Sequence, residues 1–261
     1  MAEPCPIEQE LRPDFYVAAI GRSGSTALCN WLCRPPEQLV FNEPFFLRTT
    51  NPRLLRIQLT DFGMAAGEQE WCQEDASGLE RFRRLMAPRL RRRKWAMKEV
   101  LCEEHARVVA AFAPPRVIIT VRNIVDVALS FFEKHRAQNN LDRFSDEWVR
   151  AYCVREAAGI LHLRGALAGA GTPTRVARYE DFTRSANDRA GIAEFVGWRP
   201  GETTDRHLAS FDRGFEVERH GSSFSGHLRT RSQRSLDQLH KTLAEEIGEE
   251  CQAYQASFGY S

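Results

Sequence analysis

Residues 14–32, with the sequence DFYVAAIGRSGSTALCNWL, decide the fold. The apolar run at 15–20 predicts a buried strand, and the apolar spacing of residues 27, 28, 31 and 32 predicts a helix. Between them lies the glycine-containing stretch at 21–26. A strand, a glycine-rich turn and a helix form an anion site, because free backbone N–H groups and the helix dipole meet there.

The side chains of this turn are suited to an anion as well. Hydroxyl groups can donate hydrogen bonds, and Arg22 adds a permanent cation with a planar fork of donors. A tight turn followed by a capped helix remains an alternative interpretation, which the turn by itself does not exclude. The candidate anion-binding residues are Arg22, Ser23, Gly24, Ser25 and Thr26.

The turn differs from a nucleoside-triphosphate loop. Counted from Gly21, the second glycine of that pattern would fall at Thr26, and the loop contains Arg22 instead of lysine. Gly-Arg-Ser-Gly-Ser-Thr after a strand instead resembles the 5′-phosphosulfate loop of sulfotransferases that use 3′-phosphoadenosine-5′-phosphosulfate (PAPS). The resemblance implies that Arg22 and the backbone of residues 23–26 hold the 5′-phosphosulfate.

A second segment carries the same resemblance. The β-branched run RVIITV at 116–121 predicts a strand buried on both faces, followed by Arg122, by Asn123 as N-cap and by a helix containing Ser130. VRNIVDVALSFFEKH, residues 121–135, resembles the 3′-phosphate segment of sulfotransferases, which implies that Arg122 and Ser130 bind that phosphate. Alternatively, Arg122 is a surface arginine and Ser130 bonds its own helix backbone.

Two later segments extend the resemblance. Tyr179 opens the tetrapeptide Tyr-Glu-Asp-Phe after a predicted strand, and in sulfotransferases this aromatic lies near the nucleotide; core packing is the alternative. The stretch 213–234 is rich in arginine, glycine and serine. The resemblance places Arg219 and Gly221 near the 3′-phosphate, with Arg229 a weaker third, while a mobile surface loop is the simpler reading.

Two residues at predicted strand ends are candidates for catalysis. Lys98 ends a strand beginning near Trp95, where it would neutralise charge on the leaving oxygen. Glu43 follows an apolar run at 39–41, and carbohydrate-type sulfotransferases carry a catalytic carboxylate in this region. The phenol and steroid class uses a histidine after the strand lysine; the sequence here is Lys-Glu-Val, which favours Glu43 as the base. A capping or salt-bridged role for Glu43 stays open.

Length and pattern predict one α/β domain over residues 1–261. The resemblance implies three layers, with a central, mostly parallel sheet between helices. Residues 1–13 are expected to form a tail. Residues 48–94 are expected to form an insert on the acceptor side, with no decodable signature. The basic run at 89–94 fits a solvated helix face better than a docking surface. From residue 235, apolar spacing and a Ser235–Gln238 capping box predict a terminal helix.

Composition excludes several classes. The net charge is +1, which argues against nucleic acid as a partner, and no run is long enough to span a membrane. The seven cysteines show no zinc spacing and suit a reducing cytoplasm, so we expect a cytoplasmic protein without a metal. The oligomeric state is not encoded in any pattern.

The resemblance implies transfer of a sulfuryl group from PAPS to an acceptor hydroxyl, with release of 3′-phosphoadenosine-5′-phosphate (PAP). The acceptor is expected to be a saccharide or another small metabolite. Two alternatives are a P-loop kinase or nucleoside triphosphatase, and a non-catalytic nucleotide-binding module of the same fold. The kinase reading requires a loop lysine and a strand-end aspartate for Mg²⁺, which the sequence does not supply.

Overall fold

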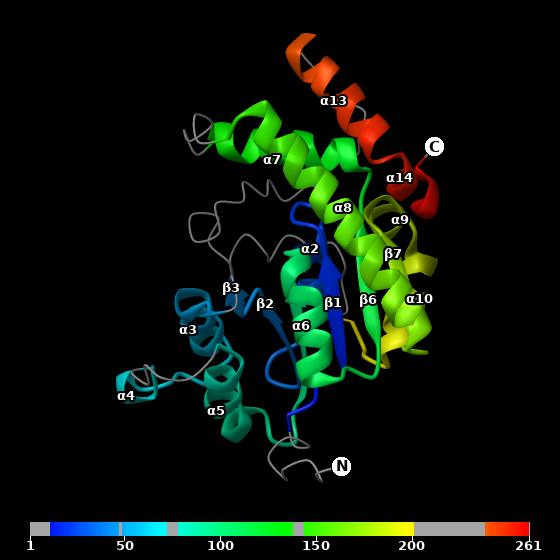
Figure 1. Ribbon diagram of the computed structural model, residues 1–261. Helices are drawn as coiled ribbons and strands as arrows, with labels where there is room; N and C mark the ends of the chain where they lie inside the picture. Colours follow the sequence, from blue (N-terminus) through cyan, green and yellow to red (C-terminus); the bar gives the residue numbers. More distant parts are fainter. Residues whose placement is uncertain (1–10, 47–48, 72–77, 138–143, 201–237, 261) are drawn as a thin grey trace.

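A five-stranded parallel sheet forms the centre of the protein (Figure 1). The computed structural model describes residues 11–46, 49–71, 78–137, 144–200 and 238–260. Every pairing in this sheet is parallel, which confirms the predicted mostly parallel sheet. In spatial order its strands are β2 (Gln38–Asn42), β5 (Lys94–Glu99), β1 (Phe15–Ala19), β6 (Val117–Val121) and β7 (Thr174–Arg178).

Helices cover both faces of the sheet, as predicted for a three-layer α/β domain. One face carries α6 (Cys102–Phe112) and α8 (Asp146–Gly169), which lie in front of the strands in Figure 1. The other face carries α2 (Ser25–Leu32), α9 (Tyr179–Arg184) and α10 (Ala186–Val196). Among the described helices, none is long and apolar enough to cross a membrane.

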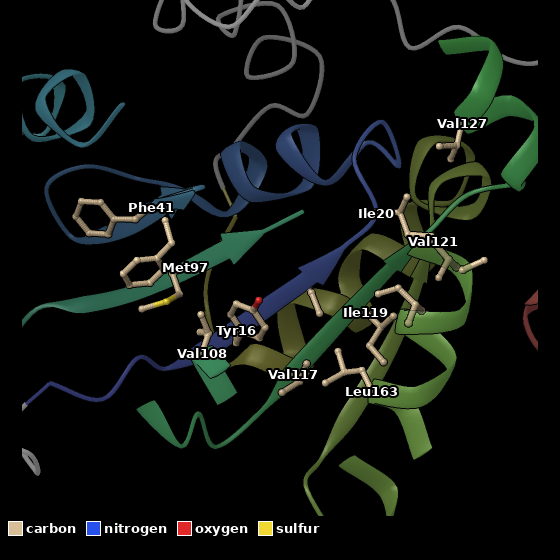
Figure 2. Close-up of a cluster of buried hydrophobic side chains, with 14 of the residues drawn as sticks. Tyr16, Ile20, Phe41, Met97, Val108, Val117, Ile119, Val121, Val127 and Leu163 are labelled. Carbon is tan, nitrogen blue, oxygen red and sulfur yellow. The ribbon is translucent and has the colours of Figure 1, made fainter. Parts of the chain in front are cut away.

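The core explains why the central strands are continuous apolar runs. Alternate side chains of β6, including Ile119, point towards α8, where Leu163 lies in the same cluster (Figure 2). Ile118, the residue before Ile119 in β6, points to the opposite face and belongs to a second cluster with Leu28 of α2. Because both faces are buried, β6 is apolar except at Thr120, whose hydroxyl bonds to the Ser23 hydroxyl inside the protein.

The helix α7 (Ile124–Ala137) extends from the carboxyl end of β6 and lies above the ends of the strands in Figure 1. It begins where the sequence predicts, since the Asn123 side-chain oxygen accepts a hydrogen bond from the Val125 N–H at 3.0 Å. Its far side packs against α8 and α13 (Gln238–Glu250). Ser130 is thereby held beside the turn that follows β1.

The segment that the sequence left undecoded contains regular structure. It consists of the two-stranded pair β3 (Phe45–Phe46) and β4 (Thr49–Thr50), followed by α3 (Pro52–Asp61), α4 (Glu68–Trp71) and α5 (Gly78–Leu90). Arg89 of the basic run forms an ion pair with Glu70 at 2.7 Å. The run ends at Lys94, the first residue of β5, and therefore lies at the end of the sheet opposite to Lys98.

Two expectations need correction. The terminal helix is broken at Cys251 into α13 and α14 (Gln252–Phe258), and the proposed capping residue Ser235 lies outside the described residues. The sequence of residues 145–168 also predicts a helix with Trp148 as a core contact, but Trp148 is 41% exposed. Its ring nevertheless stacks on Tyr152 and packs against Phe131, so it forms the outer edge of an aromatic cluster between α7 and α8.

A buried histidine network supports the end of β1. The Ala19 carbonyl can only accept, so His105 Nε2 donates to it at 3.1 Å, and His105 Nδ1 then accepts from the Tyr16 hydroxyl at 2.7 Å. Burial lowers the pKa of His105 to about 4. Both ring nitrogens form hydrogen bonds inside the protein, so His105 is a structural residue and its imidazole is neutral at pH 7.

This network predicts a loss of stability in acid. In the unfolded chain His105 is protonated below about pH 6.5, whereas in the folded protein it is protonated only near pH 4. The free energy of unfolding therefore decreases as the pH is lowered through this window. Urea unfolding at pH 7 and pH 4.5 should show a loss on the order of 2 to 3 kcal/mol from this residue. A His105→Gln variant, although less stable at pH 7, should lack this part of the slope; identical slopes would contradict the assignment.

Candidate active site

The turn after β1 has an unusual backbone. Gly24 has φ of 80°, and Arg22 has φ of 73° although it carries a side chain. The Ser23 N–H donates to the Ile20 carbonyl at 3.1 Å, which closes the turn. Positive φ at a residue other than glycine is uncommon and is concentrated at functional sites. The turn therefore holds the Arg22 side chain in a backbone conformation that the surrounding structure must maintain.

Tyr179 packs directly against this turn. A Cβ atom placed on Gly24 would lie 2.1 Å from the Tyr179 ring, so only glycine fits there. The guanidinium of Arg122 lies over the same ring, 4.4 Å from its centroid. Tyr179 thus connects the turn after β1 with the residue that ends β6.

The two predicted anion-binding segments meet at this place. Arg22 Nε donates to Ser130 Oγ at 3.2 Å, and Arg122 Nη1 donates to the Arg22 carbonyl at 3.3 Å. Burial lowers the pKa of Arg22, and the charge of Arg122 lowers it further. Two arginines so close together and so little exposed favour an anion between them.

The donor set of Arg122 has room for such a ligand. Its side chain is only 7% exposed, and its Nε atom is buried without a hydrogen-bond partner in the described part of the protein. A buried N–H of this kind costs free energy unless something accepts from it. A phosphate oxygen beside Arg122 would satisfy this donor, so the residues present fit the phosphorylated nucleotide that the sequence implies.

Lys98 and Glu43 form a pair on the neighbouring strands. Lys98 Nζ lies 2.5 Å from Glu43 Oε1 and 3.3 Å from Thr26 Oγ1. The Lys98 side chain is fully buried, whereas 37% of the Glu43 side chain is exposed. Pairing of β2 with β5 creates this contact, because the Glu43 N–H donates to the Lys98 carbonyl at 2.7 Å.

Glu43 therefore forms a salt bridge, which is the alternative role that the sequence left open for it. It also lies at the carboxyl edge of the sheet, beside the turn after β1. Its φ of 50° makes it, like Arg22, a side-chain-bearing residue in the left-handed region. The salt bridge does not remove it from solvent. A carboxylate and an ammonium placed together at the edge of the candidate anion site are groups that could take part in acid–base chemistry.

Other candidates are placed less directly. The Ser23 hydroxyl bonds to Thr120 at 3.0 Å inside the protein, so Ser23 closes the turn instead of facing a ligand. Ser25 is the first residue of α2 and is buried. Arg219, Gly221 and Arg229 lie outside the described residues.

Among the described residues, the cysteines and carboxylates form no clear metal centre. Burial raises the pKa of Cys29 to about 12 and that of Cys33 to about 11, which disfavours the thiolate that a metal would need. Elsewhere in the described residues, Cys102, Glu103 and Glu156 gather three ligand atoms within 4.8 Å. The guanidinium of Arg155 pairs with both carboxylates there, so a cation is already present.

Sequence reasoning missed a residue that supports Arg122. The Tyr254 hydroxyl accepts from the Arg122 N–H at 3.3 Å and donates to the Arg122 carbonyl at 3.0 Å. Nearby, Glu180 accepts from the Asn123 N–H and from the Tyr260 hydroxyl. Residues after 250 thus hold the end of β6 in place. No local sequence pattern could have predicted this contact, because its partners are more than a hundred residues apart.

Comparison with known proteins gives an independent view of the fold. No protein-family model and no curated protein sequence matches the chain. Among solved structures, the sulfotransferase domain of the Synechococcus PCC 7002 olefin synthase matches 91% of this chain and 95% of its own, with TM-score 0.55 and 19% identity. A sulfotransferase from Alicyclobacillus acidocaldarius matches 94% and 95%, with TM-score 0.49 and 16% identity.

The chain has the sulfotransferase fold. The prediction made from the turn at residues 21–26 and from the segment 121–135 is therefore confirmed at the level of fold. The likeness to a carbohydrate-type enzyme remains a prediction, as do the roles of the individual site residues. In this sulfotransferase fold, the strand order brings Arg22, Lys98 and Arg122 to one edge, because they follow or end the adjacent strands β1, β5 and β6.

Proposed function

We propose that this protein is a PAPS-dependent sulfotransferase. It would move a sulfuryl group from PAPS to an acceptor hydroxyl and release PAP. The contact between Arg22 and Arg122 carries this proposal, because it joins two cationic segments a hundred residues apart. The Arg122 Nε atom beside it is buried and has no hydrogen-bond partner among the described residues. A nucleotide with anionic groups at both its 5′ and 3′ positions matches that arrangement.

The candidate binding residues form two groups, one for each end of the nucleotide. Arg122 and Ser130 would bind the 3′-phosphate, with the Tyr179 ring holding the Arg122 guanidinium in place. Arg22 and the N–H groups at the start of α2 would bind the 5′-phosphosulfate, where the helix dipole favours negative charge. Glycine at position 24 keeps the backbone close to the bound anion.

The transfer step assigns separate tasks to Lys98 and Glu43. The sulfur–oxygen bond to the phosphate breaks as the bond to the acceptor oxygen forms, and the displaced oxygen leaves with PAP. Lys98 would neutralise charge on that oxygen, and Glu43 would take the acceptor proton. Lys98 would then exchange its contact with Glu43 for one with the donor, which frees the carboxylate for the acceptor.

The acceptor side is the part of the site next to Glu43. The chain continues from Glu43 into β3 and the helices α3 to α5, so this insert would border the acceptor. A saccharide or another small metabolite fits a partly exposed carboxylate better than a nucleic acid does, since the net charge is only +1. We also propose a cytoplasmic location, which the unpaired cysteines among the described residues support.

Two other functions are weaker. A kinase or nucleoside triphosphatase would hold Mg²⁺ through a strand-end aspartate, but Asp126 is buried in the first turn of α7. A non-catalytic nucleotide-binding module would have no need of Glu43 and Lys98 in contact at the edge of the site.

Nucleotide binding separates these possibilities. Thermal unfolding should be measured without ligand, with PAP in EDTA, and with ATP and Mg²⁺. At 100 times its Kd, PAP should stabilise the protein by about 2.7 kcal/mol, which raises Tm by several degrees. A rise with ATP and Mg²⁺ alone would favour the kinase, and no rise with PAP would refute the proposal. Incubation with ³⁵S-labelled PAPS and pooled saccharides and metabolites then tests transfer.

A further inference from the structure

Lys134 lies one helical turn beyond Ser130 on α7. Residues four apart in a helix lie on the same face, with Cβ atoms about 6 Å apart. Since Ser130 accepts a hydrogen bond from Arg22, this face is turned towards the turn after β1. Lys134 is therefore carried to the same edge of the sheet, and its side chain is half-buried there.

The charges around Lys134 show which end of the site it occupies. Burial lowers its pKa; Arg22 and Lys98 lower it further, while Glu43 acts in the opposite direction. Lys134 thus lies with Lys98 and Glu43, where the sulfuryl group would be transferred.

Lys134 differs from Lys98 in its partners. Lys98 bonds to Glu43 and Thr26, whereas no described residue forms a hydrogen bond or ion pair with the Lys134 ammonium. A half-buried cation beside two other cations is unfavourable in the free protein. An anion placed between Arg22, Lys98 and Lys134 would reverse that balance and be bound by all three.

We infer that Lys134 is a further catalytic residue, which binds the oxygens of the transferred sulfuryl group from the α7 side. The inference rests on the proposed function and deepens it. The sulfuryl oxygens carry negative charge at a position beyond the 5′-phosphate, where PAP has no atoms. Lys134 would hold this group over the turn while its sulfur–oxygen bond to the phosphate is exchanged for the bond to the acceptor oxygen.

PAPS and PAP provide the test, because only PAPS has the sulfuryl group that Lys134 would bind. Calorimetric titration of Lys134→Met should show roughly tenfold weaker binding of PAPS, with PAP binding changed by less than about twofold. Lys134→Arg should restore most of the PAPS affinity. Lys94→Met is the matched control, since Lys94 is an exposed lysine at the opposite end of β5 and should leave both affinities unchanged.

Each other result overturns the inference. Equal losses of PAPS and PAP affinity would make Lys134 a structural or long-range electrostatic residue, and unchanged affinities would place it outside the site. If Lys134→Met does not fold, Lys134→Gln, which keeps a polar end, gives the same comparison. Wild-type protein that binds neither nucleotide would refute the proposed function itself, which is a different outcome from loss of discrimination in the variant.

Discussion

Replacing Gly24 by alanine is expected to abolish PAP binding at concentrations that saturate the wild-type protein. At φ of 80° a side chain costs about 1 kcal/mol in backbone strain. The added methyl group would also lie 2.1 Å from the Tyr179 ring, so the ring must move and take away the support beneath Arg122. We expect PAP affinity to fall at least about 100-fold, equivalent to about 3 kcal/mol.

Gly171→Ala separates the two causes. Gly171 also has positive φ, at 65°, but a Cβ there meets nothing within 4 Å. That variant should lose about the same stability from backbone strain and keep its full PAP affinity, which titration calorimetry and thermal unfolding would measure together. If Gly24→Ala binds PAP as well as Gly171→Ala does, the turn is not where the nucleotide binds.

The second large effect is expected for Glu43→Gln. This substitution keeps the size of the side chain and removes its ability to take a proton, so the rate of sulfuryl transfer should fall roughly 10²- to 10⁴-fold. PAP affinity should change little, because the proposed role of Glu43, which contacts Lys98, is in the transfer step and not in holding the 3′-phosphate. The measurement is transfer of label from ³⁵S-labelled PAPS to the acceptor pool.

Glu37→Gln is the matched control for this experiment. Glu37 is exposed just before the first residue of β2, at the other end of the strand from Glu43, and its replacement should leave transfer unchanged. Turnover that survives Glu43→Gln would mean that another group takes the acceptor proton. His105 is not such a group, because both of its ring nitrogens are bonded inside the protein.

Local patterns in the sequence predicted the sheet well. The β-branched run at 116–121 forms β6, because such residues favour a strand that is buried on both faces. Asn123 caps the following helix, since its side-chain oxygen accepts from the Val125 N–H. The helices of the 48–94 insert were missed because their apolar residues are sparse. Asn51 followed by Pro52 was nevertheless an N-terminal helix signal, and the Asn51 side chain does accept from the Leu54 N–H.

The candidate site was predictable where its residues share a local motif. Arg22 and Ser130 belong to such motifs, and helical spacing from Ser130 would have identified Lys134. Tyr254 had no such signal, because its role depends on where a distant helix docks. Trp148 was misplaced because an apolar face on a helix indicates burial only on average, and this ring lies at the rim of its cluster.

The hydrogen bonds of Tyr254 to Arg122 have a consequence for biosynthesis. A nascent polypeptide that has emerged only as far as α10 already has every strand of the sheet, yet the arginine at the end of β6 is not anchored. Competence to grip a nucleotide would then arise late, once α14 has left the ribosome and docked. With stalled chains of increasing length, nucleotide capture would appear as one abrupt step when α14 has emerged from the exit tunnel.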